Sequence, residues 1–101
     1  ENNIPVGCGA MKAYDPGTME IKRMYTTLDS RGRGIAGKVL AELESWATQM
    51  SCEKCILETG IRQPEAIALY KKHGNHIIAN YGQYAGMESS VCFEKKLIIQ
   101  P

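Results

Sequence analysis

The chain lacks the features of a membrane-spanning or secreted protein. It contains no run of about 18 apolar residues, the length that a transmembrane helix requires. Its N-terminus has no charged segment followed by an apolar stretch, as a signal peptide would. We therefore expect a cytoplasmic protein that makes no membrane contact.

An excess of one charge sign is also missing. The chain has 12 Lys and Arg residues against 11 Asp and Glu residues, for a formal net charge of +1. A nucleic-acid-binding protein would show a basic surface with aromatic side chains among the basic ones. The balance argues against a nucleic-acid partner, and any anion-binding site must be local.

Cysteine is present but lacks the spacing of a metal site. The four cysteines are Cys8, Cys52, Cys55 and Cys92. Cys52 and Cys55 form a single C-x-x-C pair, whereas zinc sites of this type need further ligands at set spacing. Reduced cysteine in apolar surroundings behaves as a small hydrophobic residue. We therefore expect packed thiols and no metal, with metal or disulfide chemistry as the less favoured alternative.

The length of the chain, 101 residues, suits one domain spanning residues 1–101. No internal repeat, linker or low-complexity segment interrupts it. The chain begins at Glu1, and Asn2-Asn3 followed by Ile4-Pro5-Val6 is typical of a turn that leads into a strand. We expect an upstream partner strand to be missing, so that the domain is N-terminally incomplete.

Residues 31–37, Arg-Gly-Arg-Gly-Ile-Ala-Gly, are the most informative segment. They lie between a strand-like run that ends near Thr27 and a helix-like run that begins near Ile35. Glycines let a backbone approach a ligand closely, and arginines add positive charge. A helix N-terminus points free N–H groups and the positive end of its dipole at an anion. The segment is therefore typical of a phosphate or pyrophosphate site.

Two common nucleotide motifs fit this segment poorly. A P-loop requires Gly-Lys-Ser/Thr, and here Val39 follows Lys38. The dinucleotide motif G-x-G-x-x-G matches the spacing of Gly32, Gly34 and Gly37, so spacing alone does not exclude it. The arginines in the turn and the charged residues in the preceding strand argue against it.

The apolar pattern of the first half predicts a hairpin followed by a helix. Residues 4–14 and 19–27 have strand character, and Asp15-Pro16-Gly17 between them is typical of a turn. From Ile35, apolar residues recur at helical spacing for about four turns. The predicted apolar face consists of Val39, Leu40, Leu43, Trp46, Ala47 and Met50, and the polar face contains Lys38, Glu42, Glu44 and Gln49.

The second half predicts a strand, a helix and two further strands. Pro64 suits the first turn of a helix that runs to His73 and is capped by Gly74. The predicted strands are residues 55–57, 76–81 and 91–99, and a polar loop at residues 82–90 joins the last two. The inner face of the helix would contain Ala66, Ile67, Leu69 and Tyr70.

Several segments together resemble the GNAT superfamily of acetyl-CoA-dependent N-acetyltransferases, in particular one bacterial subgroup. Arg31 to Ala36 matches the family motif Arg/Gln-x-x-Gly-x-Gly/Ala, and the strand from Glu20 to Thr26 is similar to the family's fourth strand. Downstream similarity includes Leu57-Glu-Thr-Gly60, the run from Gln63 to Tyr70, Gly74, Tyr81-Gly-Gln-Tyr84 and Cys92-Phe-Glu-Lys95. The family's N-terminal strand, its following pair of helices and its second strand have no counterpart here.

The resemblance implies an α/β fold with a mixed, mostly antiparallel sheet flanked by helices, in the order β-β-α-β-α-β-β. It implies an enzyme that moves an acetyl group from acetyl-CoA to a primary amine by direct attack, without a covalent enzyme intermediate or a metal. A homodimer is a further expectation, since dimers are the most frequent soluble assembly. The alternative is an acyl-CoA-binding module without turnover, or a half-domain that needs a partner chain.

The resemblance also assigns residues to the cofactor. Backbone N–H groups from Arg31 to Gly37 would hold the pyrophosphate of coenzyme A. The main chain of residues 24–26 would pair with the pantetheine arm like an added strand. The implied cofactor-binding residues are Met24, Tyr25, Thr26, Arg31, Gly32, Arg33, Gly34, Ile35, Ala36 and Gly37.

Transfer of the acetyl group requires a base for the amine and an acid for the departing thiolate. Tyr70 matches the family tyrosine that serves as the acid, although an amphipathic helix would also bury a tyrosine there for packing alone. Glu20 is the candidate base, because some family members place a glutamate early in this strand; a solvated strand carboxylate is the other interpretation. Glu58, His73 and His76 are alternative bases.

The sequence departs from the family pattern near the acceptor side. Asn75-His76 replaces the aromatic residue that usually follows the helix-ending glycine, and Gln63 stands where many relatives have asparagine. Neither change removes an obvious chemical group. Small amines, antibiotics, peptide N-termini and protein lysines all stay open as acceptors, because the family selects them with its N-terminal helices and with loops such as residues 82–90.

Overall fold

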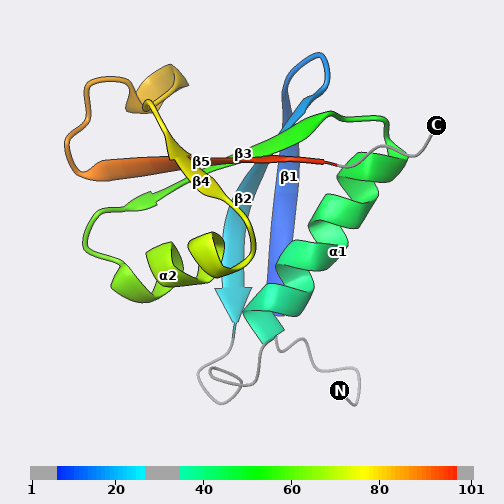
Figure 1. Cartoon of the computed structure of the whole chain (residues 1–101), viewed down its shortest axis with the longest axis horizontal. Helices are drawn as coiled ribbons and strands as arrows, with labels where there is room; N and C mark the ends of the chain where they lie inside the picture. Colours follow the sequence, from blue (N-terminus) through cyan, green and yellow to red (C-terminus); the bar gives the residue numbers. More distant parts are fainter. Residues whose placement is uncertain (1–6, 27–34, 98–101) are drawn as a thin grey trace.

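The strands form one five-stranded sheet in the order β1-β2-β3-β5-β4 (Figure 1). The structure is a computed structural model that describes residues 7–26 and 35–97. Its elements are β1 (Gly7–Asp15), β2 (Thr18–Thr26), α1 (Ile35–Gln49), β3 (Lys54–Gly60), α2 (Pro64–Lys72), β4 (His76–Ile78), the 3-10 helix η2 (Gly82–Tyr84) and β5 (Ser90–Lys96). The predicted order β-β-α-β-α-β-β is confirmed.

The sheet contains both kinds of strand pairing. β1 and β2 form an antiparallel hairpin, and Gly17 in its turn has a φ of 82°, which glycine adopts without strain. β2 and β3 are parallel, whereas β3 and β4 each pair with β5 in antiparallel fashion. The predicted mixed, mostly antiparallel sheet is confirmed, and its parallel pair is central.

The parallel pair of strands separates along its length. The register runs from Thr18 opposite Lys54 to Ile21 opposite Leu57, where the pairing ends. Beyond that point β2 continues beside β1, and β3 continues beside β5. In Figure 1 the two strands diverge toward their C-terminal ends, and α2 lies in the angle between them. The sheet therefore opens at its centre into a V.

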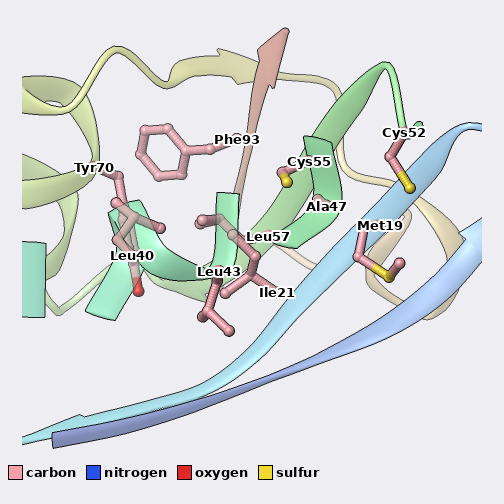
Figure 2. Close-up of a cluster of buried hydrophobic side chains, with 10 residues drawn as sticks. All are labelled: Met19, Ile21, Leu40, Leu43, Ala47, Cys52, Cys55, Leu57, Tyr70 and Phe93. Carbon is pink, nitrogen blue, oxygen red and sulfur yellow. The ribbon is translucent and has the colours of Figure 1, made fainter. Parts of the chain in front are cut away.

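One face of the sheet packs against α1. Because side chains alternate along a strand, Met19 and Ile21 share a face with their partners Cys55 and Leu57. The buried cluster consists of Met19, Ile21, Leu40, Leu43, Ala47, Cys52, Cys55, Leu57, Tyr70 and Phe93 (Figure 2). Burial of each large apolar side chain contributes roughly 1.5–3 kcal/mol. The intervening residues of β2 point to the opposite face of the sheet.

The predicted apolar face of α1 is partly wrong. Trp46 is 52% exposed and Met50 is 61% exposed, although both lie at helical spacing from the buried residues. Glu44, predicted on the polar face, is largely buried, and its Oε1 accepts a hydrogen bond from Lys95 Nζ at 2.8 Å. Helical spacing defines a wide stripe, but only contact with the sheet decides which edge of that stripe is covered.

α2 confirms the predicted second helix. Pro64 occupies its first turn, and Gly74 just after its end has a φ of 89°. Tyr70 is buried, and the predicted inner-face residues pack against the core; these are Ala66, Ile67 and Leu69. Within residues 7–26 and 35–97, neither helix is long and apolar enough to cross a membrane.

The last three strands, β3, β4 and β5, differ in length from their predictions. β3 extends past the predicted residues 55–57, because β5 pairs with it as far as Gly60. β4 ends at Ile78, before the predicted residue 81. There, Asn80 Nδ2 donates to the carbonyl oxygens of Met87 and Ser90 at 2.9 and 3.1 Å, and such local bonds compete with strand pairing. β5 ends at Lys96, and residues 98 and 99 lie outside the described part of the chain.

Three of the four cysteines are buried free thiols, namely Cys52, Cys55 and Cys92. Burial raises the pKa of Cys55 to about 12 and also raises the pKa of Cys92. The thiolate form, which binds metals, is therefore disfavoured. Among the residues that the structure describes, no group of three or more His, Cys, Asp or Glu side chains suits a metal. The prediction of packed thiols is confirmed for these three, and the side chain of Cys8 lies outside the description.

The ion pair between Glu44 and Lys95 joins α1 to β5 beside the core. Their side chains are 13% and 30% exposed, and Glu44 Oε2 is buried without a hydrogen-bond partner among the described residues. Loss of the lysine would leave a largely buried carboxylate uncompensated. We expect Lys95→Met to lower the free energy of unfolding by about 1–2 kcal/mol, as measured by urea denaturation.

Lys96 provides the matched control for this measurement. It is exposed and forms no ion pair in the described ranges, so Lys96→Met should leave stability within about 0.5 kcal/mol of the wild type. The double variant Glu44→Leu, Lys95→Met should recover most of the lost stability, because no charge is then buried. An unchanged urea midpoint for Lys95→Met would contradict a stabilising role for the pair.

Candidate functional site

A pocket of about 420 Å³ lies in the V between β2 and β3. Its wall consists of Glu20, Ile21 and Lys22 from β2; Glu58, Thr59 and Gly60 from β3; Gln63, Ala66 and Tyr70 at α2; and Tyr84 from η2. Divergence of the two strands creates the space, and α2 closes one side of it. The pocket thus brings together three residues that the sequence nominated for proton transfer: Glu20, Glu58 and Tyr70.

Glu20 is an oriented carboxylate in this pocket. It is 7% exposed, so the interpretation as a solvated strand carboxylate is wrong. Tyr81 Oη donates a hydrogen bond to Glu20 Oε2 at 2.7 Å, and Lys22 Nζ lies 3.8 Å from the same oxygen. Burial, together with this hydrogen bond, raises the pKa of Tyr81, so its phenol keeps its proton at neutral pH and continues to donate.

Glu58 faces the pocket from β3. Ser90, at the start of β5, donates a hydrogen bond from Oγ to Glu58 Oε2 at 2.7 Å. Ser90 is itself buried, and its position opposite Gly60 is set by the antiparallel register of β3 and β5. One carboxylate oxygen of Glu58 is therefore fixed by the neighbouring strand. Glu58 is thus a second oriented carboxylate at the same pocket.

Tyr70 reaches the pocket from α2. Its side chain is 7% exposed, and its ring packs against Phe93 with centroids 5.6 Å apart. Burial, and to a lesser extent the carboxylate of Glu58, raises the pKa of Tyr70 above its ordinary value near 10. The phenol is therefore neutral at physiological pH and carries a proton that it can donate.

Asn75 holds the end of the helix that carries Tyr70. Its backbone N–H and its side-chain Nδ2 both donate to the carbonyl oxygen of Tyr70, at 3.0 and 3.1 Å. Asn75 is 5% exposed, and these bonds satisfy a carbonyl that the helix itself leaves free. This departure from the family pattern therefore has a structural role.

The predicted cofactor-binding residues are divided between described and undescribed parts of the chain. Residues 24–26 lie on β2 beyond Ile21, where β3 no longer pairs with that strand. Their backbone groups on the side of the V can bond an extended ligand, as a sheet edge does. Ile35 and Ala36 open α1, and Gly37 follows in its first turn. Residues 31–34 lie outside the described residues.

The two histidines lie away from the pocket wall. His73 packs against α1, where a Cβ built at Gly37 would lie 2.7 Å from His73 Nε2. His76 is exposed on β4, with its Nε2 3.5 Å from Glu94 Oε2. Neither lines the pocket between β2 and β3. Of the four candidate bases that the sequence offered, only Glu20 and Glu58 line this pocket.

Sequence reasoning missed Lys22 and Tyr84 as pocket residues. Lys22 Nζ donates to Tyr84 Oη at 3.3 Å and lies 5.8 Å from the centroid of that ring. Because side chains alternate along β2, Lys22 lies on the same face as Glu20, opposite the apolar residues. The sequence pattern could therefore have predicted that Lys22 lies near Glu20. For Tyr84 the signal was the family similarity of residues 81–84, but nothing in β2 indicates its contact with Lys22, which lies 62 positions away in the chain.

Comparison with known proteins identifies the family. The model of the acetyltransferase (GNAT) family matches residues 1–74. The matched segment includes β2, α1, β3 and α2, the elements that frame the V. The chain therefore belongs to the GNAT acetyltransferase family, and the resemblance found in its motifs is confirmed.

Two curated relatives agree with this assignment. The chain is 36% identical over 93 residues to an IAA acetyltransferase of Azospirillum brasilense, and the match covers 91% of the chain and 61% of the relative. It is 33% identical over 99 residues to the uncharacterized N-acetyltransferase YsnE of Bacillus subtilis, and this match covers 96% of the chain and 66% of the relative. The chain thus spans less than two thirds of the length of these relatives.

Solved structures share the fold. A Klebsiella pneumoniae protein designated an acyl-CoA N-acyltransferase is 41% identical, with a TM-score of 0.87 and with 92% of this chain and 64% of that chain covered. A GNAT family acetyltransferase from Elizabethkingia anophelis, solved with acetyl-CoA bound, is 23% identical with a TM-score of 0.83. The match covers 96% of this chain and 72% of that chain. The second similarity concerns the fold alone.

The contact between Gly37 and His73 yields a test of how the two helices pack. Alanine is favoured over glycine inside a helix by about 1 kcal/mol, but a Cβ at position 37 would displace the imidazole. We expect Gly37→Ala to stabilise a His73→Ala background by roughly 0.5–1 kcal/mol, and to be neutral or destabilising in the wild-type chain. Thermal denaturation of the four proteins measures the difference. The same effect in both backgrounds would mean that an alanine side chain at position 37 does not contact the imidazole of His73.

Proposed function

We propose that the chain is the acyl-transfer core of an N-acetyltransferase, which moves the acetyl group of acetyl-CoA to a primary amine. One observation carries the proposal: divergence of β2 and β3 gathers Glu20, Glu58 and Tyr70 around one pocket of about 420 Å³. Acylation of an amine needs one group that accepts a proton and another that donates one. The pocket supplies candidates for both roles.

Acetyl-CoA suits the chain's own backbone. β2 runs beyond its last partner on β3, and residues 24–26 there offer main-chain groups with which the pantetheine arm would pair. The N-terminal turn of α1, together with the glycine-rich residues 31–37, would hold the pyrophosphate. Membership of the family and the acetyl-CoA-bound structural neighbour support this choice of co-substrate.

Glu20 is the proposed base. The attacking amine must be neutral, because an ammonium has no lone pair, and a carboxylate takes up its proton directly or through a water molecule. Tyr81 holds one oxygen of Glu20 in place at 2.7 Å. Glu58, with one oxygen bonded to Ser90, is the alternative base. As the amine nitrogen bonds to the acetyl carbon, the bond from that carbon to sulfur breaks and coenzyme A departs as a thiolate.

Tyr70 is the proposed acid, which protonates the departing thiolate. A phenol with a raised pKa is fully protonated at neutral pH, as an acid in this step must be. Packing against Phe93 limits its motion and keeps it at the pocket wall. No covalent enzyme intermediate is needed, because the two substrates react with each other.

Assembly and location stay predictions from the sequence. A homodimer and a cytoplasmic location are expected, and a bacterial source is supported by the bacterial relatives. The competing function is an acyl-CoA-binding module without turnover, alone or as a half-domain with a partner chain. Binding and transfer must therefore be measured separately.

The acetyl-CoA site is tested by isothermal titration of the chain. We expect the double variant Arg31→Ala, Gly34→Asp to weaken binding by at least about tenfold, because it removes a positive charge and places a carboxylate at the pyrophosphate. Lys96→Glu is the control, since it changes the net charge by the same amount at an exposed position outside the pocket. No binding by the folded wild-type chain would overturn the proposal. Binding without transfer to any amine would favour the binding module.

The role of Tyr70 is tested by Tyr70→Phe in a steady-state acetylation assay. We expect kcat to fall by about 10²-fold or more, while the Kd for acetyl-CoA changes less than about twofold, because the acid acts on the leaving group and not on the bound cofactor. In the wild type, Tyr70 should not limit the rate until the pH passes its raised pKa, above 10. A parallel loss of acetyl-CoA affinity would show that the hydroxyl has a binding or packing role instead.

A further inference from the structure

We propose that the acceptor of this site is a small amine that also carries a carboxylate, with the amine at Glu20 and Glu58 and the carboxylate at Lys12 and Lys22. The inference rests on the proposed function and specifies its second substrate. It follows from a second pocket, from the face of the sheet on which this pocket lies, and from the division of charge between the two pockets.

The second pocket adjoins the first. It has a volume of about 200 Å³, and its wall consists of Lys12, Ala13 and Tyr14 from β1; Glu20 and Lys22 from β2; and residues 81–84, which are Tyr81, Gly82, Gln83 and Tyr84. Three of these residues, Glu20, Lys22 and Tyr84, also line the larger pocket. A ligand in the smaller pocket would therefore share these three residues with a ligand at the proposed reaction site.

Strand register places the charged residues of this pocket on one face. Lys12 is the cross-strand partner of Glu20, and Ala10 is the partner of Lys22. Partners in an antiparallel pair project to the same side of the sheet, here the side away from α1. Lys12, Glu20 and Lys22 therefore form a continuous charged row beneath the segment that contains η2.

The two pockets differ in charge. The larger one contains two carboxylates, Glu20 and Glu58, and one ammonium, Lys22. The smaller one contains two ammoniums, Lys12 and Lys22, and one carboxylate, Glu20. The hydrogen bond with Tyr84 and the charge of Glu20 raise the pKa of Lys22, which stays positive at neutral pH. A bound molecule would thus meet negative charge at the reaction site and positive charge beside it.

Three tyrosines shape the smaller pocket. The rings of Tyr14 and Tyr81 meet edge to face with centroids 5.3 Å apart, and those of Tyr81 and Tyr84 do so at 5.6 Å. Such contacts hold the rings in fixed mutual orientation. A ligand cation is a poor occupant here, because Lys22 Nζ already lies 5.8 Å from the centroid of Tyr84. Flat aromatic walls beside two lysines favour a small anionic group with an apolar body.

A matched set of acceptors tests the inference on the full chain. The set contains three amino acids (glycine, leucine and phenylalanine), their carboxamides, and the amines that lack the carboxyl group. Acetylation rates are expressed per neutral amine, from the titration of each compound, so that differences in amine pKa do not enter. We expect the best amino acid to exceed its carboxamide and its amine in kcat/KM by roughly threefold to tenfold, mainly through KM.

Variants of Lys12 test this inference separately from the proposed acetyltransferase function, because Lys12 lines the smaller pocket and not the larger one. We expect Lys12→Gln to remove most of the carboxylate preference and Lys12→Glu to reverse it, while the plain amines are acetylated within about twofold of the wild-type rate. Lys96→Glu is the control, since this exposed residue lines neither pocket. The preference should also weaken as salt is raised from about 0.05 to 0.5 M.

Each result has a defined meaning. Loss of the preference in Lys12→Gln, with Lys96→Glu unchanged, supports the inference. Equal kcat/KM for acids, amides and amines, or a preference that survives both Lys12 variants, overturns it and leaves the proposed function intact. A preference for amines without the carboxylate also overturns it. Acetylation of no compound in the set, despite binding of acetyl-CoA, overturns the inference alone; the proposed function is overturned separately, by the absence of acetyl-CoA binding or of transfer to any amine.

Discussion

The point at which parallel pairing between β2 and β3 ends determines the rest of this structure. Thr18 to Ile21 pair with Lys54 to Leu57, and beyond them each strand follows a different partner. The strands can separate because β1 satisfies one edge of β2 and β5 satisfies one edge of β3, so each keeps half of its backbone hydrogen bonds. The separation produces the pocket, leaves part of β2 with an edge that can bond a ligand, and lets α2 bring Tyr70 to the opening.

The face of the sheet away from α1 depends on a different kind of contact. There the segment after β4 covers charged side chains. Hydrogen bonds to the carboxylates offset the cost of removing them from water: Tyr81 donates to Glu20, and Ser90 donates to Glu58. Asn80 fixes the segment itself through two backbone carbonyls. The same residues therefore stabilise the loop and orient the carboxylates. Burial of an acidic residue without these donors would be strongly unfavourable, so the loop and the site depend on each other.

Sequence periodicity predicted the elements well because it reports on local geometry. The order of strands and helices, the hairpin turn at Gly17 and the inner face of α2 are all local properties. The errors arose where partners distant in the chain set the outcome. β3 is lengthened by β5, β4 is shortened by Asn80, and α1 exposes Trp46 while it buries Glu44 against Lys95. No spacing rule within a single element contains that information.

The sequence by itself determined the family, through motifs in the first 74 residues and beyond, and it nominated Glu20, Glu58 and Tyr70 by residue type and position. Only the tertiary structure decided that these three line one pocket, that neither histidine does, and that Lys12, Lys22 and Tyr84 belong beside them. The physical reason is distance along the chain. A site at the junction of two diverging strands is assembled from β1, β2, β3, α2 and η2, and pairing register and the covering loop, not local pattern, decide which side chains meet there.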